Sequence, residues 1–387
     1  VMNDERTSEP TTGIPLSAVQ DISVQTGGFG AEYRNVRSGV INVVTKEGNP
    51  DKYSGTISFR NSPATQKHFG ISPYDKNSFW NRPYFDDDVC WTGTNNGNWD
   101  EYTQRQYPSF DGWNSVSQQT LADSNPINDL APSGAQKLST WENRKNGAIS
   151  LPDYNIDAGF GGPVPLLSKR LGNLRFFASF RSEHDAYLYQ VSRPGLNKIS
   201  SLIKLTSDLS KSMKLSFSHI MGELEATTLS RGGSASYMND VWDLASQVNM
   251  RGFTMPWRLF TNIYWSPATV NNATTAMKLT HQLSQKSFYE VLIKFDEKNY
   301  HTWHGTRRDT TRDNEILDGY YVDDSPEGFW GSPYFSIDGR LAFGGAVSTA
   351  RDTSIIRSFT VKSDFTSQYN KPNQIKAGME FVYNDLD

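Results

Sequence analysis

Short stretches of alternating apolar and polar residues recur along most of the chain. In residues 289–295 (YEVLIKF) an apolar side chain occupies every second position, and residues 174–181, 213–219 and 375–383 repeat this alternation. A period of two matches a β-strand, in which successive side chains point to opposite faces of a sheet. Each stretch therefore predicts a strand with one apolar and one polar face, and we expect an all-β protein.

The composition of the 387-residue chain agrees with this fold and excludes other classes. Aromatic residues make up 13% of the chain, and there are 30 glycines. The net charge of −4 gives no basic excess for nucleic acid, so no nucleic-acid partner is expected. No run of about 18 apolar residues could form a transmembrane helix. The hydrophobic fraction of 36% is too high for a wholly disordered chain.

Cysteine content and the first residues bear on the cellular compartment. Cys90 is the sole cysteine, which fits a cytosolic protein or a bacterial envelope protein. The first residues include neither the basic nor the apolar segment of a signal peptide. We therefore expect either that the protein is not exported or that its start lies outside this sequence.

The connections between the predicted strands alternate between short and very long. The short ones are polar turns at residues 208–211, 284–286 and 369–373. The long ones run roughly over residues 62–153, 184–197, 223–272 and 298–352. Short turns at one end of the strands and long loops at the other are expected of an outer-membrane β-barrel. Alternating strands alone also fit a soluble β-sandwich, but long loops are uncommon in compact soluble domains.

The first long connection is dense in aromatic residues, unlike a flexible linker. We expect these residues either to pack together in a small core or to contact a ligand or partner. The candidates for contact, including one from the last long connection, are Trp80, Tyr84, Trp91, Trp99, Trp113 and Trp303.

No convincing set of catalytic residues is present, so the protein is not expected to be an enzyme. Neither a Gly-x-Ser-x-Gly nucleophile motif nor a phosphate-binding glycine loop occurs. Asp86, Asp87 and Asp88 offer the oxygen ligands that calcium prefers, but no EF-hand loop surrounds them. They are weak candidates for a Ca²⁺ site, and no other cofactor or metal is expected.

Residues 15–48 interrupt the rhythm of strands and turns with a glycine-containing motif. The surrounding sequence reads IPLSAVQDISVQTGGFGAEYRNVRSGVINVVTKEG. It resembles the C-terminal end of the plug domain of TonB-dependent outer-membrane receptors, with Arg34 where many members have glycine. The residues that fill the motif are Gly27, Gly28, Gly30, Tyr33, Gly39, Asn42 and Thr45.

A second resemblance covers residues 150–182. LPDYNIDAGFGGPVP and LGNLRFFASFRSE are similar to the second and third barrel strands of receptors with a carboxypeptidase-regulatory-like extension, common in Bacteroidota. The resemblance implies that residues 1–50 end a plug domain. Residues 51–387 would then form the first part of a transmembrane antiparallel β-barrel, about nine strands of a larger barrel.

The resemblance implies a receptor in the outer membrane of a Gram-negative bacterium, which takes up a bulky nutrient when the plug moves. Its partners would be outer-membrane lipid, a surface lipoprotein and, through parts that this sequence lacks, the TonB system. Two alternatives stay open. One is a structural or docking subunit of an outer-membrane complex with transport lost, and the other is a soluble β-sandwich that binds glycans.

In such a barrel, charged residues on the polar faces would line the lumen and pair with the plug. These residues are Arg175, Arg181, Lys204, Lys214, Glu290, Lys362 and Glu380. Tyr289, Phe295, Phe365 and Tyr383 would belong to aromatic girdles at the lipid interfaces. The apolar run at residues 40–44 is expected to be buried on both faces.

Overall fold

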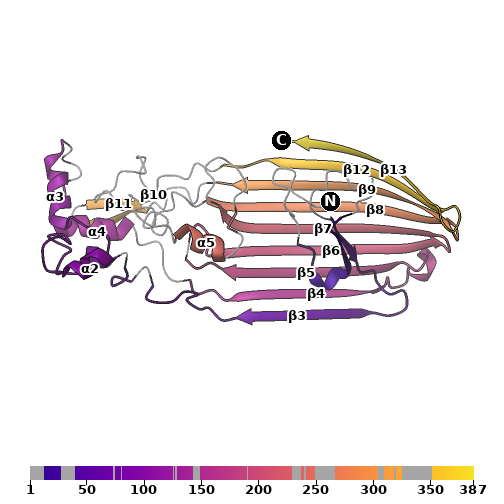
Figure 1. Cartoon of the computed structure of the whole chain (residues 1–387), viewed down its shortest axis with the longest axis horizontal. Coiled ribbons are helices and arrows are strands. Elements are labelled where there is room, and N and C mark those ends of the chain that lie inside the picture. The colour runs from indigo at the N-terminus through magenta and orange to yellow at the C-terminus, as the bar shows by residue number, and fades with distance from the viewer. Residues whose placement is uncertain are drawn as a thin grey trace.

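A computed structural model describes residues 13–27, 40–72, 75–79, 81–124, 126, 129–142, 149–189, 191–228, 237–238, 241–248, 266–303, 309–317, 320–324 and 351–387. Its main feature is a nine-stranded antiparallel sheet with the order β13-β12-β9-β8-β7-β6-β5-β4-β3 (Figure 1). These strands are β3 (Ser54–Ser62), β4 (Asp153–Pro163), β5 (Arg175–Ala186), β6 (Gly195–Ser210), β7 (Met213–Thr228), β8 (Ser266–Ser284), β9 (Ser287–Thr302), β12 (Ile355–Gln368) and β13 (Gln374–Leu386).

Two small sheets and several short helices accompany the large sheet. β1 (Val19–Gln25) pairs with β2 (Val40–Thr45), and β10 (Asp309–Leu317) pairs with β11 (Tyr320–Asp324). The helices are η1 (Leu16–Ala18), α1 (Arg82–Phe85), α2 (Glu101–Gln106), α3 (Trp113–Ala122), α4 (Pro132–Glu142), η2 (Lys169–Leu171) and α5 (Val241–Val248). Among the described residues, none of these helices combines the length and apolarity needed to cross a membrane.

The prediction of a mainly β chain with about nine sheet strands is confirmed. The turn at residues 369–373 agrees with its predicted bounds. The turns after β6 and β8 are tighter than predicted and occupy residues 211–212 and 285–286.

The bounds predicted for the long connections are too wide at every end but one, since the last connection is predicted to end at residue 352 and runs to residue 354. The intervals between the sheet strands are residues 63–152, 187–194, 229–265 and 303–354. At these ends the backbone ladder continues while the apolar residues change from one face of the strand to the other, as in Glu223–Thr228 of β7, which pairs with Ser266–Asn271 of β8. A prediction from apolar alternation therefore ends these strands too early.

The strand register gives the sheet a polar face and an apolar face. Buried polar side chains such as Asp157, Arg175 and Asp296 lie on one side, which we call the inner face. The opposite, outer face is apolar and exposed. Its exposed apolar residues include Ile57, Phe59, Phe160, Phe180, Ile199, Ile203, Phe217, Met221, Met277, Ile293, Phe295, Phe359, Phe365, Met379, Phe381 and Tyr383. This arrangement is the reverse of a water-soluble sheet, which buries its apolar face.

The first long connection forms a small helical subdomain at the end of the sheet opposite the short turns (Figure 1). Its aromatic residues pack together, as one of the two sequence interpretations expected. The buried core consists of Tyr84, Cys90, Phe110, Trp113, Val116, Leu130 and Ala135.

Candidate functional site: the docked N-terminal segment

The described N-terminal residues 13–27 and 40–49, which we call the docked segment, lie against the inner face of the large sheet (Figure 1). The prediction that residues 40–44 are buried on both faces is wrong. Ile22, Val24 and Ile41 are 53%, 63% and 68% exposed. The segment contacts the large sheet through η1 and through residues 45–48, so the faces of β1 and β2 themselves stay open.

The first contact holds η1 on strand β4. The carboxylate of Asp157 accepts hydrogen bonds from the backbone N–H groups of Leu16 and Ser17, at 2.7 and 2.8 Å. Asp157 is only 6% exposed. Two consecutive backbone N–H groups donate to this one carboxylate, so Asp157 fixes the start of η1 on the sheet.

Apolar packing and a glycine complete the seat of η1. Ala18 is fully buried against Phe177, Leu202 and Ile220 on strands β5 to β7. Beside it, a β-carbon at Gly159 would lie 2.9 Å from the β-carbon of Ser17, closer than real β-carbons approach other atoms. The absence of a side chain at position 159 therefore lets η1 come down onto the sheet.

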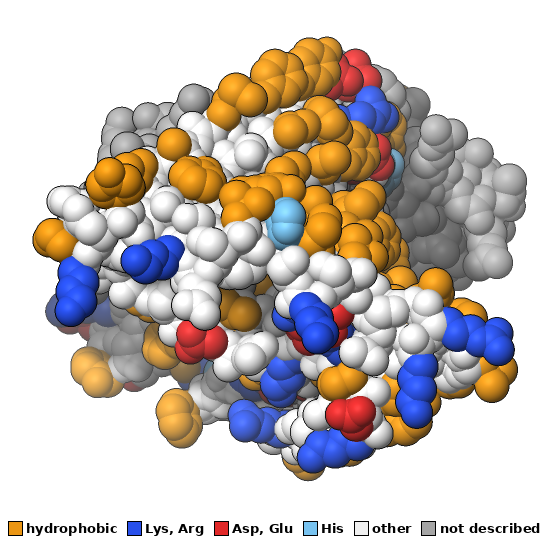
Figure 2. All heavy atoms as spheres, turned by 90° about the vertical axis from the view of Figure 1, so that its right-hand side faces the viewer, with side chains coloured by type: hydrophobic (Ala, Val, Ile, Leu, Met, Phe, Trp, Pro, Cys, Tyr) orange, Lys and Arg blue, Asp and Glu red, His pale blue; other side chains and the backbone are white. Residues whose placement is uncertain are grey.

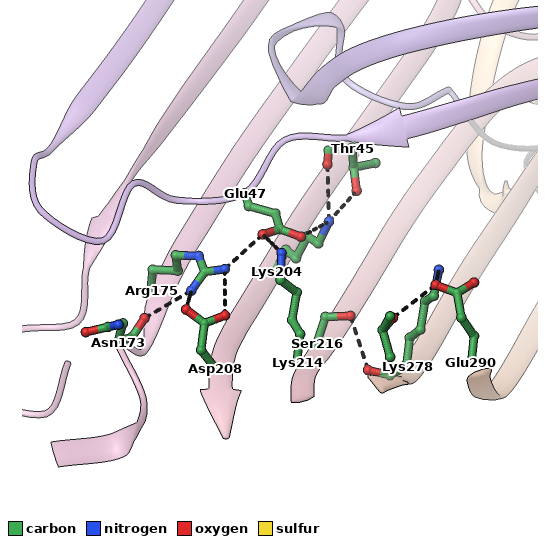
Figure 3. A network of polar contacts seen from close by, with 11 residues as sticks. Thr45, Glu47, Asn173, Arg175, Lys204, Asp208, Lys214, Ser216, Lys278 and Glu290 are labelled. Atoms are coloured by element: carbon green, nitrogen blue, oxygen red, sulfur yellow. Dashed lines mark hydrogen bonds and ion pairs between the residues drawn. The ribbon is translucent and has the colours of Figure 1, made fainter. Parts of the chain in front are cut away.

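The second contact is a cluster of charges around Glu47 (Figure 3). The Glu47 carboxylate lies 3.1 Å from Nη2 of Arg175, 3.4 Å from Nζ of Lys214 and 3.6 Å from Nζ of Lys204. Arg175 also binds both oxygens of Asp208, at 3.0 and 3.3 Å. Three neighbouring strands of the sheet thus converge on one carboxylate of the docked segment.

The charge state of Glu47 follows from these neighbours. Burial raises the pKa of Glu47, but the positive charges of Lys204, Lys214 and Arg175 outweigh burial and hold that pKa below its ordinary value of 4.5. Glu47 is therefore ionised at neutral pH. It also faces a pocket of about 490 Å³, whose lining residues are Gln20, Lys46, Glu47 and Lys214.

The predicted motif residues are only partly brought to this site. Gly28, Gly30, Tyr33 and Gly39 lie outside the described residues. Gly27 has open space around it, and Asn42 pairs with Ser23 on the exposed small sheet. Thr45 belongs to the site, because its backbone oxygen and Oγ1 accept hydrogen bonds from Lys204 at 3.1 and 3.3 Å.

The aromatic candidates divide into interior and accessible residues. The interior ones are Tyr84, Trp99 and Trp113, which are 3%, 7% and 1% exposed. They hold the helical subdomain together and cannot meet a partner directly. Trp91 packs partly buried against the same core, and Trp303 is 37% exposed. Trp80 lies outside the described residues.

The acidic residues 86–88 of the helical subdomain, the candidates for a Ca²⁺ site, include one carboxylate that is engaged within the protein. The Asp86 carboxylate accepts hydrogen bonds from Nε of Arg82 at 3.0 Å and from the backbone N–H of Asp88 at 3.2 Å. Within the described part of the chain, no three His, Cys, Asp or Glu residues gather where they could hold a metal ion. A Ca²⁺ site at Asp86, Asp87 and Asp88 stays a prediction.

Sequence reasoning found one half of the site. The alternation places Arg175, Lys204 and Lys214 on polar faces, the resemblance implies that such residues pair with the plug, and all three reach Glu47. It missed Asp157 and Gly159, because their contacts with η1 join residues about 140 positions apart. The available signal is a carboxylate beside closely spaced glycines in NIDAGFGG.

Two sequence comparisons with known proteins find no relative of this chain. A scan against models of known protein families gives no match, and a search of curated proteins gives none either. The interpretation of the docked segment therefore depends on its contacts.

Gly159→Val should displace η1 from the sheet, because the new side chain would overlap Ser17. Overpacking of this kind costs about 1–3 kcal/mol. Hydrogen exchange at the amides of Leu16 and Ser17 should accelerate, by about tenfold for each 1.4 kcal/mol. Gly222→Val is the matched control, since its β-carbon would meet the side chain of Asn272 and not the docked segment. Unchanged hydrogen exchange at Leu16 and Ser17 in Gly159→Val would contradict the close packing of η1 on the sheet at this position.

Acidification should loosen the docked segment. Because docking lowers the pKa of Glu47, its contribution is complete above the ordinary pKa of 4.5 and is lost as the pH falls through the lower pKa of the docked state. A spin label at position 42, introduced as Asn42→Cys, should become more mobile over that pH range. In Glu47→Gln the label should be mobile already at neutral pH and show no further acid transition. An identical acid transition in that variant would assign the effect to another group.

Proposed function

We propose that this chain is part of an outer-membrane β-barrel receptor that takes up a bulky nutrient, with the docked segment as part of a movable plug. One observation carries this proposal: a peptide segment is docked by charges on the polar face of a sheet whose other face is apolar and exposed. The rest of the proposal is a Bacteroidota-type receptor that engages the TonB system through parts outside this sequence and a surface lipoprotein through its long connections.

The apolar outer face supports placement in lipid. Soluble monomers rarely expose a continuous apolar surface of this extent. The apolar outward positions extend on β6 from Ile199 to Leu205, interrupted by Ser201, and on β13 from Ile375 to Tyr383. At 3.4 Å per residue these runs span about 20 and 27 Å along the strands, close to the apolar band of outer-membrane barrels. The band ends toward the long connections at charged residues, where Nε of Arg357 lies 3.0 Å from Glu297.

The edges of the sheet support a larger barrel. β3 and β13 are its end strands, and nearly all their described residues are exposed. Edge strands in lipid would leave backbone N–H and C=O groups without partners, at a cost of several kcal/mol each. We therefore take the nine strands to be continued by further strands of a closed barrel.

The polar residues of the inner face are evidence for a water-filled path beneath the plug. Beyond the docked segment it carries the ion pairs Lys278–Glu290, Lys294–Asp296 and Lys362–Asp364, at 2.8, 2.5 and 3.1 Å. The docked segment itself is held by a small apolar seat and two polar contacts. Such contacts can be exchanged for water, so a pull on the segment would release it and open the path.

Gating can be tested in cells that make the native protein, without knowing the nutrient. Gly159→Val should raise sensitivity to vancomycin, a bulky antibiotic that an intact outer membrane excludes, because the loosened segment leaves the path open. Gly222→Val should leave sensitivity unchanged. Normal resistance in Gly159→Val cells that carry the usual amount of protein in the outer membrane would refute gating by this segment.

The second candidate function is a docking subunit of an outer-membrane complex without transport. The helical subdomain favours it, because that connection builds its own core. A bifunctional thiol crosslinker between Gln20→Cys and Lys214→Cys separates the two functions, since both side chains line the pocket between the docked segment and β7. Cys90 will not interfere, because burial raises the pKa of its thiol to about 11. Locking the segment should abolish nutrient-dependent growth if the protein transports, and should have no effect if it only docks.

A further inference from the structure

The end of the sheet with the short connections is basic. These connections are residues 164–174, 211–212, 285–286 and 369–373, and none contains an acidic residue. Their cations are Lys169, Arg170, Lys211, Lys286 and Lys371, all of them exposed. Viewed from this end, Lys and Arg side chains gather mostly in the lower half, and hydrophobic side chains cover much of the upper half (Figure 2).

The connection between β4 and β5 places leucines beside its cations. Leu166 is 95% exposed, and Leu167 and Leu171 are 45% and 51% exposed, next to Lys169 and Arg170. Leu166 also has a φ of 64°, a left-handed conformation that leucine rarely adopts. The strained backbone holds this apolar side chain away from the protein, which points to a surface that it meets.

Hydrogen bonds fix the shape of this connection. The backbone N–H of Val164 donates to the oxygen of Leu174 at 3.0 Å, and Oγ of Ser207 donates to the oxygen of Leu171 at 2.7 Å. The backbone N–H of Asp208 donates to the oxygen of Gly172 at 2.6 Å. The leucines and cations of residues 164–174 are therefore presented by a folded unit attached to β6.

The opposite end of the sheet has the other charge. Residues 63–152, the longest connection there, contain ten acidic and seven basic residues. Net positive charge thus lies at one end of the apolar band, where a headgroup layer would lie. Clustered Lys and Arg beside an apolar surface attract anionic phospholipids, and leucines of such a segment can enter the boundary between headgroups and acyl chains.

We propose that the short-connection end binds the headgroups of anionic phospholipids, with residues 164–174 as an interfacial anchor. Leu166, Leu167 and Leu171 enter the acyl boundary, while Lys169 and Arg170 bind lipid phosphates. The inference depends on the proposed function, because it requires the outer face to lie in a bilayer. It adds a lipid preference and an orientation, in which the short connections face an anionic leaflet.

Native mass spectrometry of the detergent-solubilised full chain tests this inference. The protein is mixed with equal amounts of phosphatidylglycerol and phosphatidylcholine, and the bound lipids are counted. Phosphatidylglycerol should be preferred, and added salt should weaken the preference. Lys169→Gln/Arg170→Gln should lower bound phosphatidylglycerol by about fivefold per lost cation, the factor for about 1 kcal/mol. The matched control Lys76→Gln/Arg105→Gln, at the other end, should bind like the unchanged protein.

Three results would overturn the inference. Equal binding of the two lipids removes the preference for anionic headgroups while leaving the proposed function intact. An equal loss in the control variant shows that the effect comes from total charge and not from this end. A protein that stays soluble without detergent and binds neither lipid removes both this inference and the proposed function. Leu166→Ser should lower binding of both lipids, because it acts on the apolar part of the anchor.

Discussion

Phe381→Lys should destabilise the folded protein in a lipid bilayer by about 2–4 kcal/mol, whereas Val382→Lys should cost little. The two residues are neighbours on β13 and are 58% and 43% exposed. They differ in the face that they occupy. Phe381 pairs with Val361 on the apolar outer face, and Val382 pairs with Thr360 on the polar inner face. In lipid, a lysine on the outer face must enter hydrocarbon, while one on the inner face reaches water.

Equilibrium unfolding of the purified native protein in phospholipid vesicles measures this difference. Exposure alone predicts nearly equal effects, because both side chains are accessible and both changes introduce the same charge. If Phe381→Lys lowers the free energy of unfolding much more than Val382→Lys does, the outer face is in contact with lipid and the inner face with water. Equal losses would mean that the outer face is not in contact with lipid, and the proposed function would fail with it.

The sheet was predictable from sequence because its signal is local. A period of two reveals a strand wherever one face is apolar, as in residues 289–295 of β9 and 375–383 of β13. The signal is interrupted where the apolar residues change from one face of the strand to the other, as they do between Met221 and Leu224 of β7, although backbone pairing continues through Glu223–Thr228. The helices of the first long connection gave no clear period, because they are short and their core residues come from several segments.

The site was harder to predict because it is made by contacts between distant parts of the chain. Arg175, Lys204 and Lys214 could be assigned to the inner face by alternation. Their shared partner Glu47 lies beyond the strand pattern, and Asp157 has a role that appears only when η1 lies above it. The direction of a charged side chain is thus readable from sequence, while its partner depends on the path of the docked segment.

Trp113→Ala should unfold the helical subdomain at a cost of about 3–5 kcal/mol and leave the large sheet intact. Trp113 is 1% exposed and packs against Tyr84 in a tilted arrangement and against Phe110 edge to face, with ring centroids 6.2 and 5.1 Å away. Its Nε1 donates to the backbone oxygen of Tyr84 at 2.9 Å. Truncation removes these contacts together and leaves a cavity at the centre of the subdomain core.

Limited proteolysis can separate the subdomain from the sheet in this test. Trp113→Ala should be cleaved within residues 81–142 much faster than the unchanged protein, while the fragment that contains the sheet stays resistant. Trp242→Ala is the matched control, because Trp242 on α5 is 81% exposed and its loss should change little. Equal loss of protection in the sheet would show that the subdomain and the sheet fold as one unit. A selective effect would mean that the helical subdomain can be unfolded while the docked segment keeps its contacts with the sheet.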